Sequence, residues 1–229
     1  MTTADLETAM DTELLLRVDG TLPPSAEAAA ALNALCDRAE ASSPALVVLR
    51  ATGAPVAPWP GGTGVRAVNK WERAVRRLER LDTVTVTVAE GDCGGLALDV
   101  LLAADLRLAT ADVRLLMAGQ DADAWPGMGL YRLVQQIGVA RARRPVLFGE
   151  PIPAGEALEL RLIDEIVRDL PNGTERAHEM AGSREGTEFA IRRRLLHEAQ
   201  TATFDDALGR HLAACDRLLR RRTSQEGTL

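Results

Sequence analysis

The segment Val84–Asp105, VTVTVAEGDCGGLALDVLLAAD, constrains the fold more than any other part of the chain. Its β-branched residues predict a strand, its glycines Gly91, Gly94 and Gly95 predict a tight turn, and the apolar run that follows predicts a buried helix. The first backbone amides of such a helix have no partner within the helix and point toward whatever lies above the turn. Amides in that position can hold an oxyanion without a metal or a catalytic serine.

The helix after this turn carries one carboxylate, Asp99, in an otherwise apolar run from Leu96 to Ala104. Burying an unpaired carboxylate is costly, so Asp99 either faces a cleft or has compensating partners. The helix start would stabilise the ionised form, whereas apolar walls would favour the neutral acid. Leu96 and Asp99 share a helix face, so the Leu96 amide and the Asp99 carboxylate can address one bound group. The alternative is that Asp99 only decorates the helix start and that the glycines only make the turn.

The composition favours one main domain. The chain has 229 residues, and 46% of them are apolar, which is enough for one substantial core with a small appendage. A net charge of -6 and a pI near 5.2 argue against a nucleic-acid partner, because phosphate binding needs clustered positive charge. The three widely spaced cysteines, without a CxxC pair, fit a reducing compartment better than a disulfide framework, and no zinc site is readable.

The amino-terminal residues open acidic and lack the basic region and apolar run of a secretion signal. No stretch approaches the roughly eighteen consecutive apolar residues that a membrane-spanning helix needs. We therefore expect a cytoplasmic protein that has no membrane partner.

The rest of the chain alternates strand-like and helix-like segments. Expected strands cover residues 13–18, 45–50, 106–110, 113–117 and 165–167, and expected helices cover 26–38, 68–78, a stretch ending near 138, 153–161, and 187 to about 222. Ser25 is the expected cap of the first helix, and Trp71 lies on the apolar stripe of the second, where Glu72 and Arg76 are expected to pair on the outer face. Residues 1–170 are expected to form the core, and residues 171–229 a helical segment that serves oligomerisation or acts as a lid.

Several motifs occur in an order that resembles the enoyl-CoA hydratase/isomerase (crotonase) family over about residues 45–167. They are the glycine turn GDCGG, the helix end AAD, the WPGMGLYRL loop, LFG, the AGEA helix and the LI strand start. The resemblance implies an α/β fold, a crotonase-like ββα superhelix with C-terminal helices. It also implies a homotrimer or hexamer that binds acyl-CoA as substrate and needs no other cofactor.

The same resemblance assigns site residues. It places an oxyanion-binding amide at Leu96, within the turn made by Gly94 and Gly95, and the first catalytic carboxylate at Asp99. The second amide is expected from residues 57–61, where Trp59 stands between two prolines that have no N–H.

The residues that follow depart from the hydratase pattern. The position of the second hydratase glutamate falls on Gly119, which argues against a two-carboxylate mechanism. Asp121 and Asp123 lie nearby, but we expect their acidic loop to be solvated. Trp125 lies in the loop that borders the acyl pocket in the family, so it lines the pocket or simply packs. With Gly94 and Gly95, Trp125 and Gly119 complete the expected substrate-binding set.

Within the family, the strings KWERAVRRLERL, GDCGGLALD and AWPGMGLYRLVQQ resemble hydratase-like accessory proteins of dihydroxyphenylglycine biosynthesis in glycopeptide-antibiotic producers. This resemblance implies an accessory enzyme that works with a type III polyketide synthase and another hydratase-like protein. Its role would be to promote dehydration and aromatisation of a malonyl-CoA-derived tetraketide to 3,5-dihydroxyphenylacetyl-CoA.

Three hypotheses therefore stand beside one another. The favoured one is the accessory dehydratase, with Asp99 as its proton shuttle. The second is an independent hydratase, isomerase or thioesterase, and the third is a non-catalytic subunit that stabilises a complex. A Ser/His/Asp mechanism has no support because no histidine lies near the glycine turn, and for the same reason Cys93 is expected to be a small buried residue rather than a nucleophile.

Overall fold

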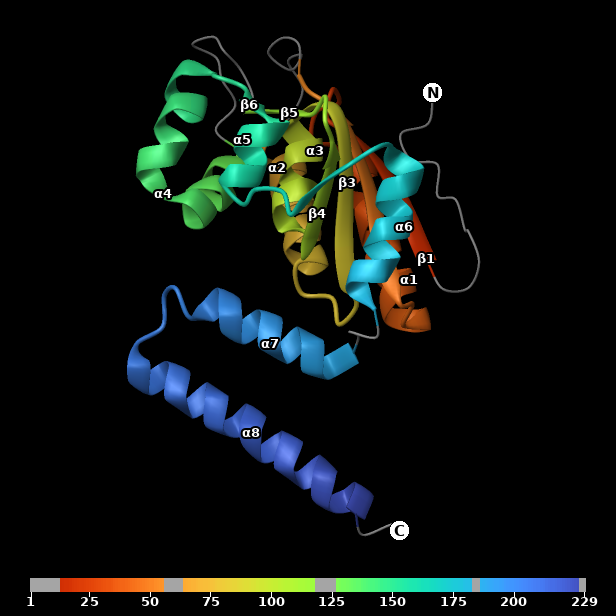
Figure 1. Cartoon of the computed structure of the whole chain (residues 1–229), viewed down its shortest axis with the longest axis vertical. Coiled ribbons are helices and arrows are strands. Elements are labelled where there is room, and N and C mark those ends of the chain that lie inside the picture. The colour runs from red at the N-terminus through yellow and green to blue at the C-terminus, as the bar shows by residue number, and fades with distance from the viewer. Residues whose placement is uncertain (1–12, 56–63, 118–126, 183–185, 227–229) are drawn as a thin grey trace. The chain divides into compact units, whose positions relative to one another are not determined.

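The computed structural model describes residues 13–55, 64–117, 127–182 and 186–226 (Figure 1). The chain divides into two compact units, residues 1–184 and residues 185–229, and each is described by itself. The sequence pattern predicts a boundary at residue 170, whereas the units divide after Arg184, so the last helix before that point belongs to the first unit.

The first unit is built on a mainly parallel sheet. Its strands are β1 (Glu13–Asp19), β2 (Leu46–Gly53), β3 (Val84–Gly94), β4 (Leu106–Thr110), β5 (Arg114–Leu116), β6 (Ile152–Pro153) and β7 (Glu165–Val167). Strands β1, β2, β3, β4 and β7 lie side by side in that order and are parallel. The last residues of β3 pair instead with β5, which continues into an antiparallel pair with β6. Strand β3 therefore changes partner within the glycine segment Gly91–Gly95.

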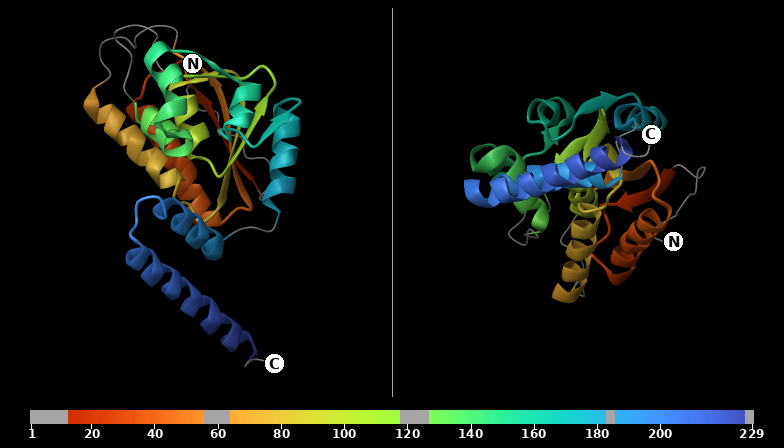
Figure 2. Two further views of the ribbon diagram at one scale, coloured as in Figure 1. Left: turned by 60° about the vertical axis from the view of Figure 1, so that its left-hand side comes forward. Right: turned by 90° about the horizontal axis from the view of Figure 1, so that it is seen from below.

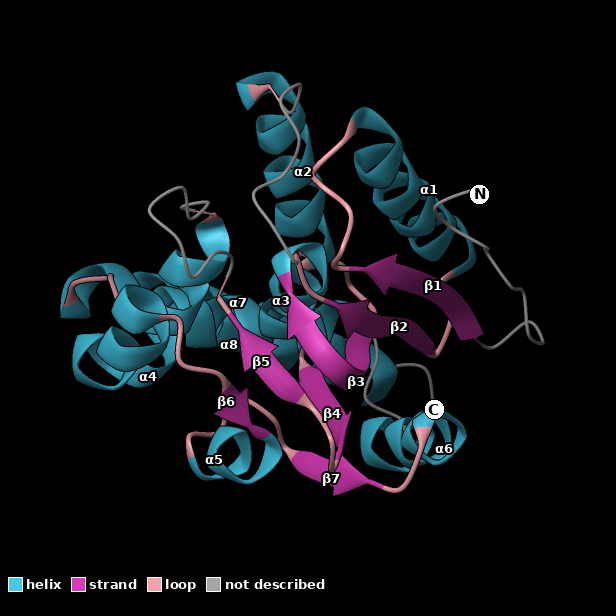
Figure 3. Ribbon diagram, turned by 90° about the horizontal axis from the view of Figure 1, so that it is seen from above, coloured by secondary structure: helices cyan, strands magenta, loops and turns pink. Residues whose placement is uncertain are grey.

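Helices cover both faces of this sheet (Figures 2 and 3). They are α1 (Ala26–Ser42), α2 (Val65–Leu78), α3 (Gly95–Ala103), α4 (Met128–Phe148), α5 (Ala154–Glu159) and α6 (Leu170–Ala181). Figure 3 shows α1, α2 and α3 on one face and α6 on the other. The first four residues of β2, LVVL, are fully buried, as expected for a parallel strand covered on both sides.

Helix α6 packs closely on the sheet because its inner position is a glycine. A Cβ atom added to Gly173 would lie 2.4 Å from Cγ1 of Val88 on β3. The Asp169 side chain caps this helix by accepting a hydrogen bond from the Asn172 amide at 2.8 Å.

The second unit consists of helices α7 (Gly186–Glu198) and α8 (Phe204–Glu226). Glu188 of α7 pairs with Arg221 of α8 at 2.8 Å and with Arg217 at 3.6 Å. The guanidinium of Arg193 lies over the ring of Phe189, 5.4 Å from its centre.

Most of the expected elements are present, and Ser25 caps α1 as predicted. Three expectations differ from the structure. Helix α6 lies in the C-terminal part expected to be helical, but the sequence did not delimit it as a separate helix. The helical run after residue 187 is divided between α7 and α8, and the helix expected to end near Gly138 continues as a second segment to Phe148. The predicted end does coincide with a kink, where Gly138 has a φ of 76°.

Candidate functional site

The glycine turn lies where the ends of three strands meet. Strands β2 and β3 pair in register up to Thr52 and Glu90, and then Gly53 pairs with Cys93. Strand β3 therefore has extra residues at this point, and Gly91 among them takes a left-handed φ of 60°. The irregularity brings the end of β3 back beside the end of β2 and against β5.

Gly94 must be a glycine because other parts of the chain contact it closely. A Cβ atom there would lie 2.8 Å from Cβ of Ala54, just after β2, and 3.0 Å from the carbonyl oxygen of Leu116 on β5. Gly95 follows with a φ of 51° and begins α3 without any connecting loop. The start of the segment after β2 therefore lies against the turn, which is the arrangement that two oxyanion amides from these two places would need.

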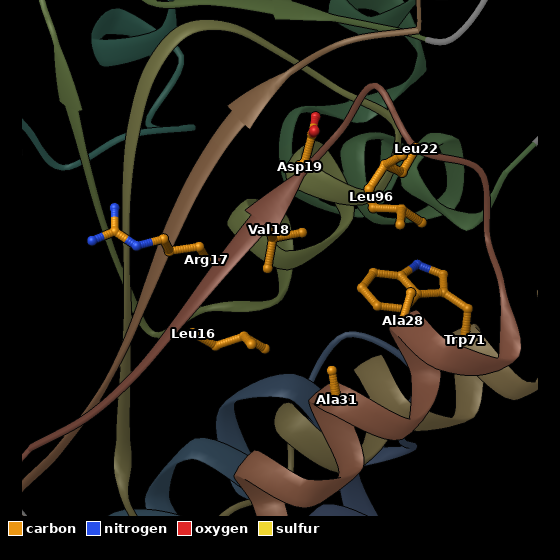
Figure 4. Close-up of a pocket in the computed structure, with 9 residues that line it drawn as sticks. All are labelled: Leu16, Arg17, Val18, Asp19, Leu22, Ala28, Ala31, Trp71 and Leu96. Carbon is orange, nitrogen blue, oxygen red and sulfur yellow. The ribbon is translucent and has the colours of Figure 1, made fainter. Parts of the chain in front are cut away.

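Leu96 has a side chain and an amide with different surroundings. Its side chain is 2% exposed and, with Trp71 and Leu22, lines a narrow, mostly apolar cavity of about 20 Å³ (Figure 4). Its amide lies in the first turn of α3, where Gly94 supplies no side-chain cap. Amides in a first turn lack partners within the helix, so the role predicted for the Leu96 amide remains available to it.

Asp99 is buried and has two partners from other helices. The indole Nε1–H of Trp71 on α2 donates to Oδ2 of Asp99 at 2.9 Å. Nη1 of Arg132 on α4 lies 3.6 Å from Oδ1. A Cβ atom on Gly129, in the first turn of α4, would approach Oδ1 to 3.1 Å. The carboxylate is therefore held between α2 and α4, and its contacts with Trp71 and Arg132 compensate for its burial.

Arg132 also connects Glu72 of α2 with Glu79, the residue that directly follows this helix. Its Nε donates to Oε1 of Glu79 at 2.8 Å, and its Nη1 donates to Oε2 of Glu72 at 3.0 Å. The expected pairing of Glu72 with Arg76 is therefore wrong, since Arg76 instead contacts Glu79 at 2.6 Å. Glu72 turns to Arg132 because a nearly buried guanidinium offers a stronger partner than an exposed neighbour on the same helix.

The electrostatics of this group separate Asp99 from the glutamates. Burial is the main cause that raises the pKa of Asp99 to about 7, and the charge of Glu72 adds to it, while Arg132 and the Trp71 hydrogen bond oppose it. Burial would also raise the pKa of Glu79, but Arg132 and Arg76 outweigh it and leave that pKa below its ordinary value. Asp99 can therefore hold a proton near neutral pH.

Cys93 lies next to this turn and is fully buried. Burial, with a smaller contribution from the charge of Asp99, raises the pKa of the Cys93 thiol to about 12. A thiol in this state is a poor nucleophile, which confirms the structural interpretation of Cys93. Among the described residues, no group of three or more His, Cys, Asp or Glu side chains could hold a metal ion.

The structure thus brings Gly94, Gly95, Leu96 and Asp99 together at one end of β3. The other predicted site residues, Trp59, Gly119 and Trp125, lie outside the described residues, as do Asp121 and Asp123. Sequence reasoning missed the contacts of Arg132, although its position directly after the PGMGLY turn marks it as part of the same motif.

This fold and site define a crotonase-type α/β protein. The sequence profile described as enoyl-CoA hydratase/isomerase matches residues 66–228. A protein of Amycolatopsis orientalis described as an enoyl-CoA-hydratase is 50% identical over 213 residues, which are 93% of this chain and 98% of that protein. The chain belongs to the enoyl-CoA hydratase/isomerase family.

Solved structures agree with the fold. An enoyl-CoA hydratase of Mycobacterium smegmatis matches with a TM-score of 0.82 at 16% identity, and the match covers 99% of this chain and 94% of that one. An enoyl-CoA hydratase/isomerase of Marinobacter aquaeolei matches with a TM-score of 0.81 at 20% identity and the same coverage. The predicted fold class is confirmed. No helix within the described residues has the length and apolar character to span a membrane.

Proposed function

We propose that this chain is an acyl-CoA-handling accessory enzyme that assists a type III polyketide synthase. The reaction would be the dehydration and aromatisation of a malonyl-CoA-derived tetraketide to 3,5-dihydroxyphenylacetyl-CoA. The observation that carries this proposal is Asp99, a single carboxyl group beside a glycine turn, with a pKa near 7 and therefore able to give and take a proton.

One such group is sufficient for the loss of water from a polyketide ring. Protonated Asp99 gives its proton to the departing hydroxyl, the C–O bond breaks, and water leaves. The Asp99 carboxylate then takes a proton from the neighbouring carbon, whose bonding electron pair becomes the new C=C bond, and the acid is restored. The Leu96 amide and a second amide from residues 57–61, for which Trp59 is the candidate, would hold the thioester oxygen.

A hydratase that adds water to the C=C bond of an enoyl thioester gains no such help from aromaticity and normally uses two carboxylates. Here the second position falls on Gly119. The resemblance of three motifs to accessory proteins of dihydroxyphenylglycine biosynthesis supports the partnership with a synthase and a second hydratase-like protein. We further propose that the chain acts as a homotrimer or hexamer, and that it binds acyl-CoA as its substrate and needs no cofactor.

The test is a reconstituted reaction of malonyl-CoA with a type III polyketide synthase and the second hydratase-like protein. Adding this chain should raise the rate of 3,5-dihydroxyphenylacetyl-CoA formation, measured by chromatography. Asp99→Asn keeps an oxygen for the Trp71 hydrogen bond but cannot shuttle the proton, so it should reduce the stimulated rate by roughly 10²- to 10⁴-fold.

Glu40→Gln is the matched control, since Glu40 pairs with Arg77 on the surface of the first unit. It should stimulate the reaction as the unchanged protein does. Full stimulation by Asp99→Asn would instead favour a non-catalytic stabilising subunit.

The second candidate function is an independent enoyl-CoA hydratase or isomerase, which the description of the Amycolatopsis orientalis protein favours. It predicts that the chain alone hydrates crotonyl-CoA, with loss of the enoyl absorbance. The accessory proposal predicts no comparable rate without the synthase.

A further inference from the structure

Three carboxylates surround one guanidinium in the interior of the first unit. Arg132 is only 9% exposed, and the side chains of Glu72, Glu79 and Asp99 are 17%, 14% and 12% exposed. The cluster joins α2, α3 and α4 through contacts between residues that are far apart in the sequence. Three carboxylates outnumber the one guanidinium, so keeping all three ionised away from water costs free energy.

The two glutamates make the closest contacts with the guanidinium groups. Glu79 contacts two guanidinium groups, since Arg132 donates to Oε1 at 2.8 Å and Arg76 to Oε2 at 2.6 Å. Glu72 receives a direct hydrogen bond from Nη1 of Arg132 at 3.0 Å. Asp99 lies 3.6 Å from the same nitrogen, and its close donor is the neutral indole of Trp71. Asp99 is therefore the carboxylate with the weakest charge compensation.

We infer that Glu72 and Glu79, both held by Arg132, are positioning residues that keep the one carboxyl proton of the cluster on Asp99, so that Asp99 meets its substrate as an acid. The inference rests on the proposed function for its consequence but not for its test. It assigns α2 an electrostatic role: the helix supplies the negative charges that favour the neutral form of Asp99, and Trp71 fixes the orientation of the carboxyl group.

The groups that face Asp99 from every described element agree with this assignment. From α2 they are Glu72, which raises its pKa, and Trp71, which lowers it, and from the residue after α2 it is Glu79, which raises it. From α4 it is Arg132, which lowers the pKa, and from β3 it is the neutral thiol of Cys93. Burial and the two glutamates outweigh the guanidinium and the indole.

Trp71 provides a readout that needs no substrate. Because its indole N–H donates directly to Asp99, the indole resonance in a ¹⁵N NMR spectrum should shift as Asp99 gains or loses its proton. The chain has three tryptophans, so Trp71→Phe identifies the signal and Asp99→Asn should abolish its titration. In the unchanged protein we expect a midpoint near 7.

Glu72→Gln is the decisive variant. It keeps an oxygen that can accept from Arg132 but removes the negative charge, so the midpoint of the Trp71 titration should fall by about one pH unit or more. Glu79→Gln should lower it less, because Glu79 contacts the Nε side of the guanidinium rather than Nη1. Glu40→Gln, outside the cluster, should leave the midpoint unchanged. Circular dichroism verifies that each variant is folded.

In the activity assay, the pH at which the rate falls on the alkaline side should be lowered most by Glu72→Gln, less by Glu79→Gln and not by Glu40→Gln. A midpoint near the ordinary aspartate value in the unchanged protein, or equal midpoints in Glu72→Gln and Glu40→Gln, would overturn the inference. A normal titration series in a protein that stimulates no synthase would leave the positioning network standing and remove the proposed function.

Discussion

Helices α3 and α8 place their apolar residues in opposite surroundings. Seven of the nine residues of α3 are buried, and Leu101 is completely inaccessible. No residue of α8 whose burial the structure describes is buried, and its exposed side chains include Leu208, Leu212 and Leu219. A helix that is apolar on nearly every side, such as α3, is buried within its own unit. A helix with one exposed apolar stripe, such as α8, has apolar surface that contact with another surface would bury.

The difference separates two tasks. Helix α3 contacts the sheet and positions Asp99, so its sequence is set by packing and by the site. In α8, Leu208, Leu212 and Leu219 are spaced by four and seven residues and so lie on one face, and we propose that they are buried between copies of the chain in a homotrimer or hexamer.

The largest change in the free energy of unfolding is expected in α3. Leu101→Ala removes a fully buried side chain and should destabilise the first unit by about 2–5 kcal/mol, measured by denaturant unfolding. Leu212→Ala makes the same chemical change at a side chain that is 58% exposed in α8. It should cost a small fraction of that amount, and equal losses would show that the contrast between the helices is wrong.

The next largest effect concerns assembly. Leu208→Asp combined with Leu212→Asp places charges on the apolar stripe of α8 and should lower the mass measured by analytical ultracentrifugation, while circular dichroism shows the fold of the first unit retained. Ala213→Asp adds a charge at an exposed neighbouring position and is the control. An unchanged mass for the double variant would mean that α8 is not an assembly surface.

The buried carboxyl group of α3 should make stability depend on pH. The native pKa of Asp99 is about 7, above its ordinary value of 3.8, so between these values the native state binds a proton that the unfolded chain has released. The contribution of Asp99 to stability is therefore present at low pH and is lost as the pH rises through 7.

Asp99→Asn should remove that loss. Its melting temperature relative to the unchanged protein should be higher at pH 8 than at pH 5, as measured by calorimetry at both values. The same relative melting temperature at the two pH values would show that Asp99 titrates normally.

Local patterns predicted the strand–turn–helix segment, the buried Trp71 and the Ser25 cap, because strand and helix periodicity and capping depend on near neighbours in the sequence. The contacts of Arg132 could not be predicted in this way. They join α4 to residues of α2 and α3 that are distant in sequence, and the local rule instead suggested the wrong partner for Glu72. Helix α6 lies within the expected C-terminal helical segment, but its bounds could not be predicted because its sequence, LPNGTERAHEMA, contains Pro and Gly and has few large apolar residues.

The smallest effect on stability, and a clear difference in reactivity, is expected from the cysteines. Cys36 and Cys93 are buried, and burial raises the pKa of each thiol to about 12, whereas Cys215 on α8 is exposed. A thiol reagent should therefore modify Cys215 faster than Cys36 or Cys93 in the folded protein, and mass spectrometry should locate the modified residue. Cys215→Ser should remove the rapid reaction and change the free energy of unfolding by about 0.5 kcal/mol or less.

The same thiol also tests burial of the α8 stripe in the assembly, because Cys215 lies on this helix between Leu212 and Leu219. Its rate of modification should increase in the Leu208→Asp and Leu212→Asp double variant. An unchanged rate would place Cys215 outside the assembly surface.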